Sequence, residues 1–280
     1  MKNKRWNLVL FIGLGLMISS CNLPVLMENQ DDIVVDQTSQ LPTQSNQPIA
    51  SETSEPGGTP TLLEDEITVL DRKIFVEVDD PLYGVEGVWP NLEGSEVLVD
   101  AFNNEIDQFI EAVLDDFLVA LNDLSNEIQG EGEQPLSFLT FNYELTYSDR
   151  HLFSFYLTFD RYISLSAHPF PFSHALNYDA KNSQILNLED LFLPGTDPVQ
   201  EISIRLDPIL KGRGFGYQEG IAAEVMRQRE NWNLLLDGLQ INFDVYEVAP
   251  YAAGPQHVLI PWEDLVDLID PSGPAGSMMN

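Results

Sequence analysis

The sequence predicts an α+β fold, in which a mainly antiparallel sheet packs against one long amphipathic helix and shorter helices follow toward the C-terminus. Residues 98–128 carry apolar side chains at steps of three and four, which is the period of a helix with one buried face. Short runs before and after this segment alternate apolar and polar side chains, as half-buried strands do. Because strands and helices do not alternate strictly along the chain, an α+β fold is favoured over a parallel α/β sheet.

Two extended segments precede the long helix. Residues 67–78 alternate apolar and polar side chains and stop at Asp79-Asp80-Pro81, where the proline removes a backbone donor. Residues 85–90 form a second, shorter extended piece that ends in Trp89-Pro90. We therefore expect two strands at the start of the folded region.

The long helix has recognisable ends. Ser95 is a residue type that caps helices, and Glu96 places negative charge in the first turn, where it complements the helix dipole. The glycine-containing segment 130–135 ends the pattern. The apolar stripe is wider than a coiled-coil seam, so we expect it to pack against the sheet. The opposite face is expected to carry Asn103, Asp107, Glu111, Asp115 and Asp123.

Three strands are expected after the helix, at 138–147, 152–162 and 174–179. Residues 148–151 form a plausible hairpin turn between the first two of these strands. Residues 188–192 are expected to form a short turn that docks its apolar side chains on the core.

The C-terminal part is expected to contain two helices and a hairpin. The helices cover roughly 198–210 and 219–230, and a short strand follows at 234–236. Residues 239–246 alternate apolar and polar side chains, which predicts a strand with one buried face. A loop stiffened by two prolines joins it to a last strand at 258–261.

The composition restricts the class of partner. The chain of 280 residues has a formal net charge of -32. Nucleic acid is therefore not an expected partner, because binding phosphate requires clustered Lys and Arg. The charge favours cationic partners, namely basic proteins, basic peptides or divalent metal ions. Solubility alone also explains such a charge, and the composition does not separate the two interpretations.

The first residues resemble a bacterial export signal. A basic start is followed by the apolar residues 6–17, which are too few for a comfortable membrane span, and then by Ile18-Ser19-Ser20-Cys21. These four residues resemble the lipoprotein cleavage box, whose cysteine is lipidated. We therefore expect a signal peptide at 1–21 and a lipid on Cys21, which anchors the chain on the extracytoplasmic face of the cell membrane. An ordinary secretory signal or an uncleaved anchor is the alternative.

Residues 22–60 are rich in Asn, Gln, Ser, Thr, Pro and Gly and show no apolar period. We expect them to be a disordered tether with a root-mean-square reach of roughly 35 Å. Such a tether would hold a folded domain clear of the membrane to which Cys21 is anchored.

No catalytic motif stands out, and no enzyme activity, cofactor or metal is expected. His168 and His174 are the only close pair of histidines, and the prolines between them give a spacing unlike that of a helical metal pair. Cys21 is the single cysteine, so a structural zinc site is not expected. We expect His168 to bond within a chain reversal, with a metal or catalytic role as the alternatives. Basic residues concentrate in one region, where they either balance local acids or form a recognition patch. They are Arg205, Lys211, Arg213, Arg227 and Arg229.

Several short motifs follow one another in a family-specific order. They are W-P-N-L-E-G at 89–94, A-H-P at 167–169, L-N-Y-D at 176–179, L-E-D-L-F at 188–192 and A-P-Y-A-A-G at 249–254. In this order they resemble the RsiV-like extracellular domain family, which also occurs as the non-catalytic N-terminal part of a peptidoglycan deacetylase. The chain departs from the family pattern at Ser166, where the family usually has glycine before A-H-P.

The resemblance implies a binding or sensing domain, with its two halves at 61–165 and 166–270 and a flexible tail at 271–280. In the anti-sigma-factor member of the family this kind of domain binds lysozyme, which is a strongly basic protein. The candidate binding or motif residues on this basis are His168, Tyr246, Glu247 and Tyr251.

We therefore expect a membrane-anchored, extracytoplasmic lipoprotein whose domain binds a ligand in the cell envelope. That ligand is either a basic lysozyme-like protein or peptidoglycan. A cell-wall-acting hydrolase and a divalent-cation-binding surface protein are the alternative functions.

Overall fold

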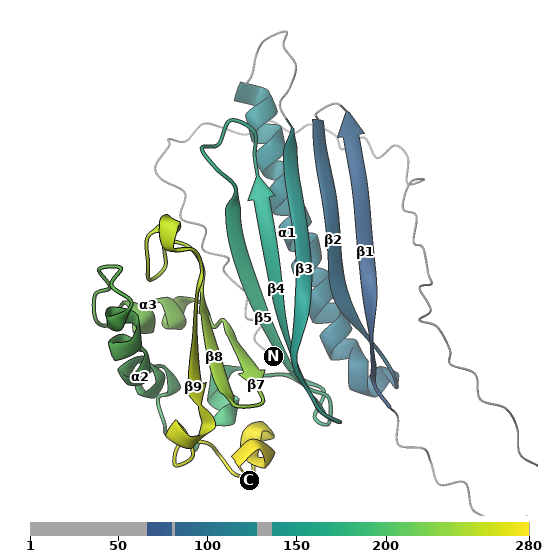
Figure 1. Ribbon diagram of the computed structural model, residues 1–280. Coiled ribbons are helices and arrows are strands. Elements are labelled where there is room, and N and C mark those ends of the chain that lie inside the picture. The colour runs from purple at the N-terminus through teal and green to yellow at the C-terminus, as the bar shows by residue number, and fades with distance from the viewer. Residues whose placement is uncertain (1–65, 80–81, 128–135, 280) are drawn as a thin grey trace, which may run out of the picture. The chain divides into compact units, whose positions relative to one another are not determined.

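The computed structural model describes residues 66–79, 82–127 and 136–279 (Figure 1). The expected signal peptide with Cys21 and the expected tether at 22–60 lie outside these residues. The structure confirms the α+β fold, with sheets rich in antiparallel pairs and one long helix. Among the described residues, no helix is both long enough and apolar enough to cross a membrane.

The N-terminal strands form one six-stranded sheet in the order β1-β2-β3-β4-β5-β6. Neighbouring strands are antiparallel except β2 and β3, which pair in parallel between Tyr83 and Gly87. A helical crossover returns the chain to the same end of the sheet, and so the long helix accounts for this one parallel pair. The strands are β1 Thr68–Asp79, β2 Leu82–Glu93, β3 Ser137–Ser148, β4 Leu152–Tyr162, β5 Phe170–Asp179 and β6 Gln184–Ile185.

The helix α1, Glu96–Glu127, connects β2 to β3 and lies across one face of this sheet (Figure 1). The predicted apolar stripe is its buried face, where Phe102 packs against Phe155 and Tyr178 of the sheet. The Tyr178 hydroxyl donates to the backbone oxygen of Leu98 over 2.6 Å. The expected packing of the helix against the sheet is therefore confirmed.

Two residues expected on the opposite face of α1 contact the sheet instead. The Asn103 side chain accepts from the Leu92 N–H (2.8 Å) and donates to the Leu92 oxygen (2.9 Å). Asp107 accepts from Arg72 (2.6 Å) and from the indole N–H of Trp89 (3.2 Å). The strand β3 pairs with β2 only as far as Gly87, so Asn103 supplies backbone partners beyond the end of that pairing.

The C-terminal part contains a second sheet, in the order β7-β8-β9, and the helices α2 and α3. Its apolar core is separate from that beneath α1 and includes Leu206, Trp232 and Ile260. The expected helices and strands are all present, with ends that differ by a few residues. The elements are η1 Leu188–Leu191, α2 Pro198–Gly212, α3 Ile221–Gln228, β7 Trp232–Leu235, β8 Gly238–Phe243, η2 Tyr251–Ala253, β9 Gln256–Pro261, η3 Trp262–Asp264 and η4 Pro274–Met279.

The strand β8 is shorter than expected and is covered on both faces. Its polar residue Asn242 is buried, and its amide donates to Asn233 Oδ1 over 2.8 Å. The Asn233 amide in turn donates to Ser154 Oγ (3.0 Å) and to the Phe155 oxygen (2.9 Å), both in β4. The prediction that one face of this strand is exposed is therefore wrong. The polar face of β8 contacts a buried network of hydrogen bonds that joins β8 to the six-stranded sheet.

The last residues also differ from the expected flexible tail. Residues 274–279 form η4, and Ala275 is fully buried in the core of the C-terminal part. Gly276 lies so close to Pro271 that a Cβ would overlap its backbone. The expected division of the domain at residue 165 would separate β4 from β5, although these two strands pair along their lengths. The second sheet begins only at Trp232.

Candidate functional site: an aromatic cluster at the surface

The loop between β8 and β9 has a strained and well-bonded backbone. Tyr246 has a φ of 71°, which is uncommon for any residue except glycine. The Glu247 N–H donates to the Asp244 oxygen over 3.2 Å and closes the turn around Tyr246. Farther along, the Gly254 N–H donates to the Tyr251 oxygen over 2.9 Å at the end of η2. A side chain held by a strained backbone is a feature of binding sites, which makes Tyr246 a candidate for function.

Tyr246 belongs to a cluster of three rings. The rings of His168 and Tyr251 lie 3.9 Å apart between centroids, and those of Tyr246 and Tyr251 lie 5.5 Å apart. The Tyr246 side chain is 59% exposed, whereas His168 and Tyr251 are half-buried. We call these three residues the aromatic cluster. It presents a large, rigid and partly polar surface to the solvent.

Hydrogen bonds fix the two inner rings to the backbone before β5. The Tyr251 hydroxyl donates to the Pro169 oxygen over 2.9 Å, and His168 Nδ1 lies 2.8 Å from the same oxygen. A carbonyl oxygen only accepts, so Nδ1 carries a proton and Nε2 is directed toward the hydroxyl of Tyr246, 3.4 Å away. The expectation that His168 bonds within the chain reversal is confirmed.

A network of charged and polar side chains holds the loop in place through Asp244 and Glu247. Arg229 Nη2 lies 2.9 Å from Asp244 Oδ2 and 2.9 Å from Glu247 Oε2, and Arg229 Nη1 donates to the Ser173 oxygen over 2.7 Å. Ser173 Oγ donates to Asp244 Oδ1 (2.5 Å) and accepts from the Asn231 amide (2.9 Å). We call these five residues the support network. It joins β5, the segment after α3 and both residues that flank Val245-Tyr246.

Burial changes the acidity of the support network. Desolvation raises the pKa of Asp244 and of Glu247, and the positive charge of Arg229 acts in the opposite direction on both. Desolvation also raises the pKa of the neighbouring Tyr156. One arginine thus compensates the buried carboxylate of Asp244 and the half-buried carboxylate of Glu247, so the loop depends on Arg229 for its charge balance.

His174 makes its ring contact with the long helix and not with the aromatic cluster. Its ring stacks on Phe109 of α1, with 3.9 Å between centroids. Burial, followed by the charge of Arg229, lowers the pKa of His174 to about 3, so the ring is neutral at physiological pH. The structural role expected for this histidine fits these contacts.

The structure brings the sequence-predicted residues into one region. His168, Tyr246 and Tyr251 form the aromatic cluster, and Glu247 belongs to the support network beneath it. Cys21 lies outside the described residues. Asp244, Ser173 and Asn231 were not predictable as site residues, because nothing in their local sequence pattern distinguishes them from surface residues.

The basic residues grouped in the sequence mostly have internal partners. Arg205 bonds Glu201, Arg213 bonds Gln256 and the His257 oxygen, and Arg227 lies 3.9 Å from Asp197. Together with Arg229 in the support network, these contacts favour the charge-balancing interpretation over a recognition patch. Within residues 66–79, 82–127 and 136–279, no group of three or more His, Cys, Asp or Glu side chains is arranged to hold a metal ion.

Part of the chain is similar to a known protein family. Residues 189–263 match a family described as a protein of unknown function, DUF3298. This range contains α2, α3, the second sheet, Tyr246 and Tyr251, whereas His168 lies outside it. None of the curated proteins matches the chain. The finer resemblance to the RsiV-like family stays a prediction.

Two solved structures are similar. One is a member of the DUF3298 family from Bacteroides fragilis, with 18% sequence identity, a TM-score of 0.54, and coverage of 78% of this chain and 98% of that one. The other is a DUF3298 family protein from Pseudomonas aeruginosa, with 15% identity, a TM-score of 0.45, and coverage of 75% and 95%. The first likeness shows a shared fold. Residues 189–263 are therefore similar to the DUF3298 family, which is described as a protein of unknown function.

Proposed function

We propose that the protein is a lipid-anchored, extracytoplasmic binding protein whose domain recognises a basic protein of the cell envelope through the aromatic cluster. The observation that carries this proposal is the exposed ring of Tyr246, which is tilted against the ring of Tyr251 and flanked in sequence by two residues of the support network. Tyrosine is enriched among the residues that dominate binding energies at interfaces, because it combines a large rigid ring with a polar end.

The charge of the chain favours a protein ligand of opposite sign. A net charge of -32 attracts cationic partners and speeds their association at low ionic strength. The family resemblance implies the same class of ligand, a lysozyme-like protein. Peptidoglycan is the other ligand expected from the sequence, and the same experiment separates the two.

The test measures binding of lysozyme and, separately, of purified peptidoglycan to the immobilised full chain at low and physiological salt. We expect lysozyme to bind and Tyr246→Ala to weaken it about tenfold or more, since a tyrosine anchor contributes more than about 1 kcal/mol. The matched control is Phe75→Ala, which removes a similarly exposed ring (66%) from β1. If peptidoglycan binds and lysozyme does not, the ligand is peptidoglycan and the proposed protein ligand is wrong. An equal loss of affinity in Tyr246→Ala and Phe75→Ala would contradict the aromatic cluster as the binding surface.

The membrane anchor has its own test. Cys21 is the last of the four residues that resemble a lipoprotein cleavage box. We expect Cys21→Ala to abolish incorporation of labelled palmitate in a bacterial host and to release the chain from the membrane fraction. Unchanged labelling and fractionation in that variant would contradict lipidation at Cys21.

A hydrolase remains the alternative to a binding protein. Release of soluble fragments from labelled peptidoglycan by the purified chain, lost in His168→Ala, would favour that alternative. We expect no release, because the contacts of His168 are those of a ring fixed between a backbone carbonyl and two tyrosines.

A further inference from the structure

The six-stranded sheet ends in two edge strands of unequal length (Figure 1). The strand β6 has only two residues, whereas β1 has 12 and pairs with β2 along its whole length. Among the described residues, no strand pairs with the outer side of β1. Natural sheets usually shorten, bulge or interrupt their edges, because unpaired backbone groups recruit another strand. The strand β1 carries no proline, and its register with β2 has no shift, so its outer edge is open to pairing.

The two faces of β1 differ in character. Ile74 and Val76 are half-buried and pack against the core beneath α1. Because side chains alternate along a strand, Lys73, Phe75 and Glu77 lie on the other face, and all three are exposed. The ring of Phe75 is 66% exposed. The outer face of this edge strand thus carries an aromatic ring between a positive and a negative side chain.

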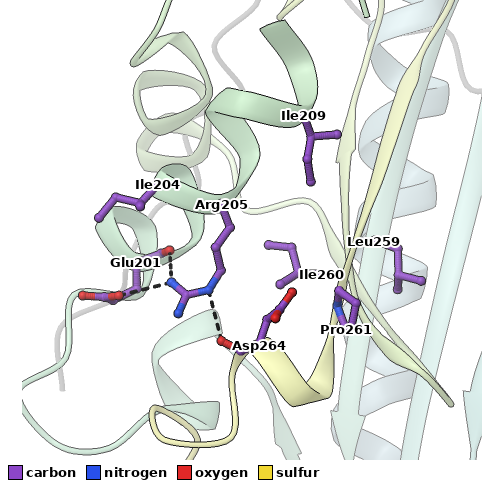
Figure 2. A pocket seen from close by; sticks show the side chains of 8 residues that line it. All are labelled: Glu201, Ile204, Arg205, Ile209, Leu259, Ile260, Pro261 and Asp264. Carbon is purple, nitrogen blue, oxygen red and sulfur yellow. Dashed lines mark hydrogen bonds and ion pairs between the residues drawn. The ribbon is translucent and has the colours of Figure 1, made fainter. Parts of the chain in front are cut away.

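Exposed apolar side chains elsewhere lack such an arrangement. Beside α2 and β9, Ile204 lies on the outer side of α2, and Leu259 lies on the sheet face opposite Ile260 (Figure 2). These side chains do not form a single face. Phe75, by contrast, lies on a strand whose backbone is itself available to a partner.

The sequence of β1 is complementary to itself in one antiparallel register. Two copies related by a two-fold axis perpendicular to the sheet bring side chains of the same face opposite each other. With Phe75 on the axis, the two Phe75 rings meet, and Lys73 of each copy lies opposite Glu77 of the other. On the side of α1, Ile74 of each copy lies opposite Val76 of the other. Aromatic, apolar and oppositely charged pairs of this kind stabilise neighbouring strands.

Neighbouring registers are less favourable. A shift by two residues in one direction places Asp71 opposite Glu77 and Lys73 opposite Phe75. The opposite shift places Phe75 opposite Glu77, so both shifts separate the two rings. In the favoured register Asp71 and Asp79 face each other at the two ends of the paired segment, where both are exposed and solvent screens their repulsion. The lysine, which would otherwise protect the edge, is neutralised by Glu77 of the second copy.

We propose that β1 pairs antiparallel with β1 of a second copy of this chain, with Phe75 on the two-fold axis. The two six-stranded sheets then form one continuous sheet. The net charge of -32 opposes association, but at physiological salt the Debye length is about 8 Å, so charges close to the shared edge dominate. None of these residues belongs to the aromatic cluster or the support network, so this inference does not depend on the proposed function.

Analytical ultracentrifugation of the purified full chain at physiological salt, over a wide range of concentration, tests the proposal. We expect a reversible equilibrium between monomer and dimer. Lys73→Glu and Glu77→Lys should each raise the dissociation constant of the dimer about tenfold or more, since each creates two like-charge pairs across the axis. The double variant Lys73→Glu/Glu77→Lys restores opposite charges and should restore the dimer. The matched control is Lys181→Glu, which makes the same charge change at an exposed position outside β1 and should have little effect.

Cysteine trapping tests the register. In a Cys21→Ala background, an added oxidant should join two copies of Phe75→Cys, because residue 75 meets its own copy on the axis. Lys73→Cys should not react in this way, because its two copies would be offset by four residues, or roughly 13 Å, along the strands. Thermal unfolding confirms that the variants fold.

Three results would overturn the proposal. They are a monomer at every concentration, a dimer that Lys73→Glu leaves intact, and trapping through Lys73→Cys in place of Phe75→Cys. A monomer in which hydrogen exchange is slow at every amide of β1 would assign the edge to another segment of the same chain and would also overturn the proposal.

Discussion

Replacing Arg229 by methionine tests the support network beneath the aromatic cluster. The substitution keeps the apolar stem of the side chain and removes the cation that lies 2.9 Å from both Asp244 and Glu247. It also removes the donor to the Ser173 oxygen. Two carboxylates whose pKa values desolvation already raises are then left without their compensating charge.

The magnitude follows from the burial of the three side chains. Asp244 is 10% exposed, and breaking a fully buried pair costs about 3–5 kcal/mol because an uncompensated charge remains. Arg229 is 30% exposed, so solvent screens part of its interaction. We therefore expect Arg229→Met to lower the free energy of unfolding by about 2–3 kcal/mol at neutral pH.

The loss should depend on pH in a definite direction. A carboxyl group whose folded pKa is raised binds a proton in the folded state before it does so in the unfolded state. Its protonation therefore favours folding as the pH falls through the raised pKa, and stability decreases as the pH rises. Removing Arg229 raises the pKa values of Asp244 and Glu247 further, so the variant should lose less stability relative to the natural chain at mildly acidic pH than at neutral pH.

The assay is urea unfolding followed by the fluorescence of Trp232 and Trp262, both buried in the same core as the second sheet. The control is Arg227→Met, whose partner Asp197 lies 3.9 Å away with both side chains exposed, so about 0.5 kcal/mol or less is expected. A loss of stability in Arg229→Met no larger than that in the control, or a loss that increases as the pH falls, would contradict a charge-compensating role for Arg229.

Three further predictions concern the fold. Asn233→Leu leaves buried partners in both sheets unsatisfied and should lower the free energy of unfolding by about 1–3 kcal/mol in urea titrations; no change would contradict a structural role for the network. Gly87→Ala places a Cβ in overlap with the ring of Phe141 and should lower the free energy of unfolding by about 1–3 kcal/mol. Gly84→Ala, whose nearest contact is 3.8 Å away, should lower it much less. Similar melting temperatures of the two variants would argue against the close packing at Gly87. His174 has a lowered pKa, so the unfolded chain binds its proton first and stability should fall between pH 6.5 and about 3; His174→Phe should remove that part of the pH dependence, and an unchanged profile would assign it elsewhere.

Long periodic elements were predictable because their signal is local. The apolar steps from Leu98 onward defined α1, and alternation defined β3 and β4 with the turn between them. Ser95 and Glu96 correctly indicated the start of the helix. In each case a residue's own neighbours in the sequence carry the information, so no knowledge of the rest of the fold is needed.

Contacts between distant segments were not predictable in the same way. The alternation in β8 indicated one buried face, but Asn242 is buried because Asn233 and Ser154 lie over it. Asn103 was assigned to the exposed side of α1, although it replaces a missing strand partner at Leu92. A periodic pattern reports how polar a face is and does not report whether another polar group covers that face.

The candidate site was only partly accessible from the sequence. The motif around Tyr251 and the A-H-P motif were recognisable as family features, but Tyr246 and His168 are 78 positions apart, and their proximity required the fold. The strained backbone of Tyr246 and its dependence on Arg229 likewise appeared only in the structure. The residues of the cluster are therefore recognisable in the sequence, whereas the residues that support them are not.

Hydrogen–deuterium exchange of the full chain with and without lysozyme is the most direct test of the aromatic cluster as a binding surface, since it reports where a ligand covers the backbone. We expect slower exchange in 244–254 and around His168 and Pro169, and little change in β1. Protection confined to other segments, or no protection at ligand concentrations that saturate binding, would contradict the aromatic cluster as the binding surface.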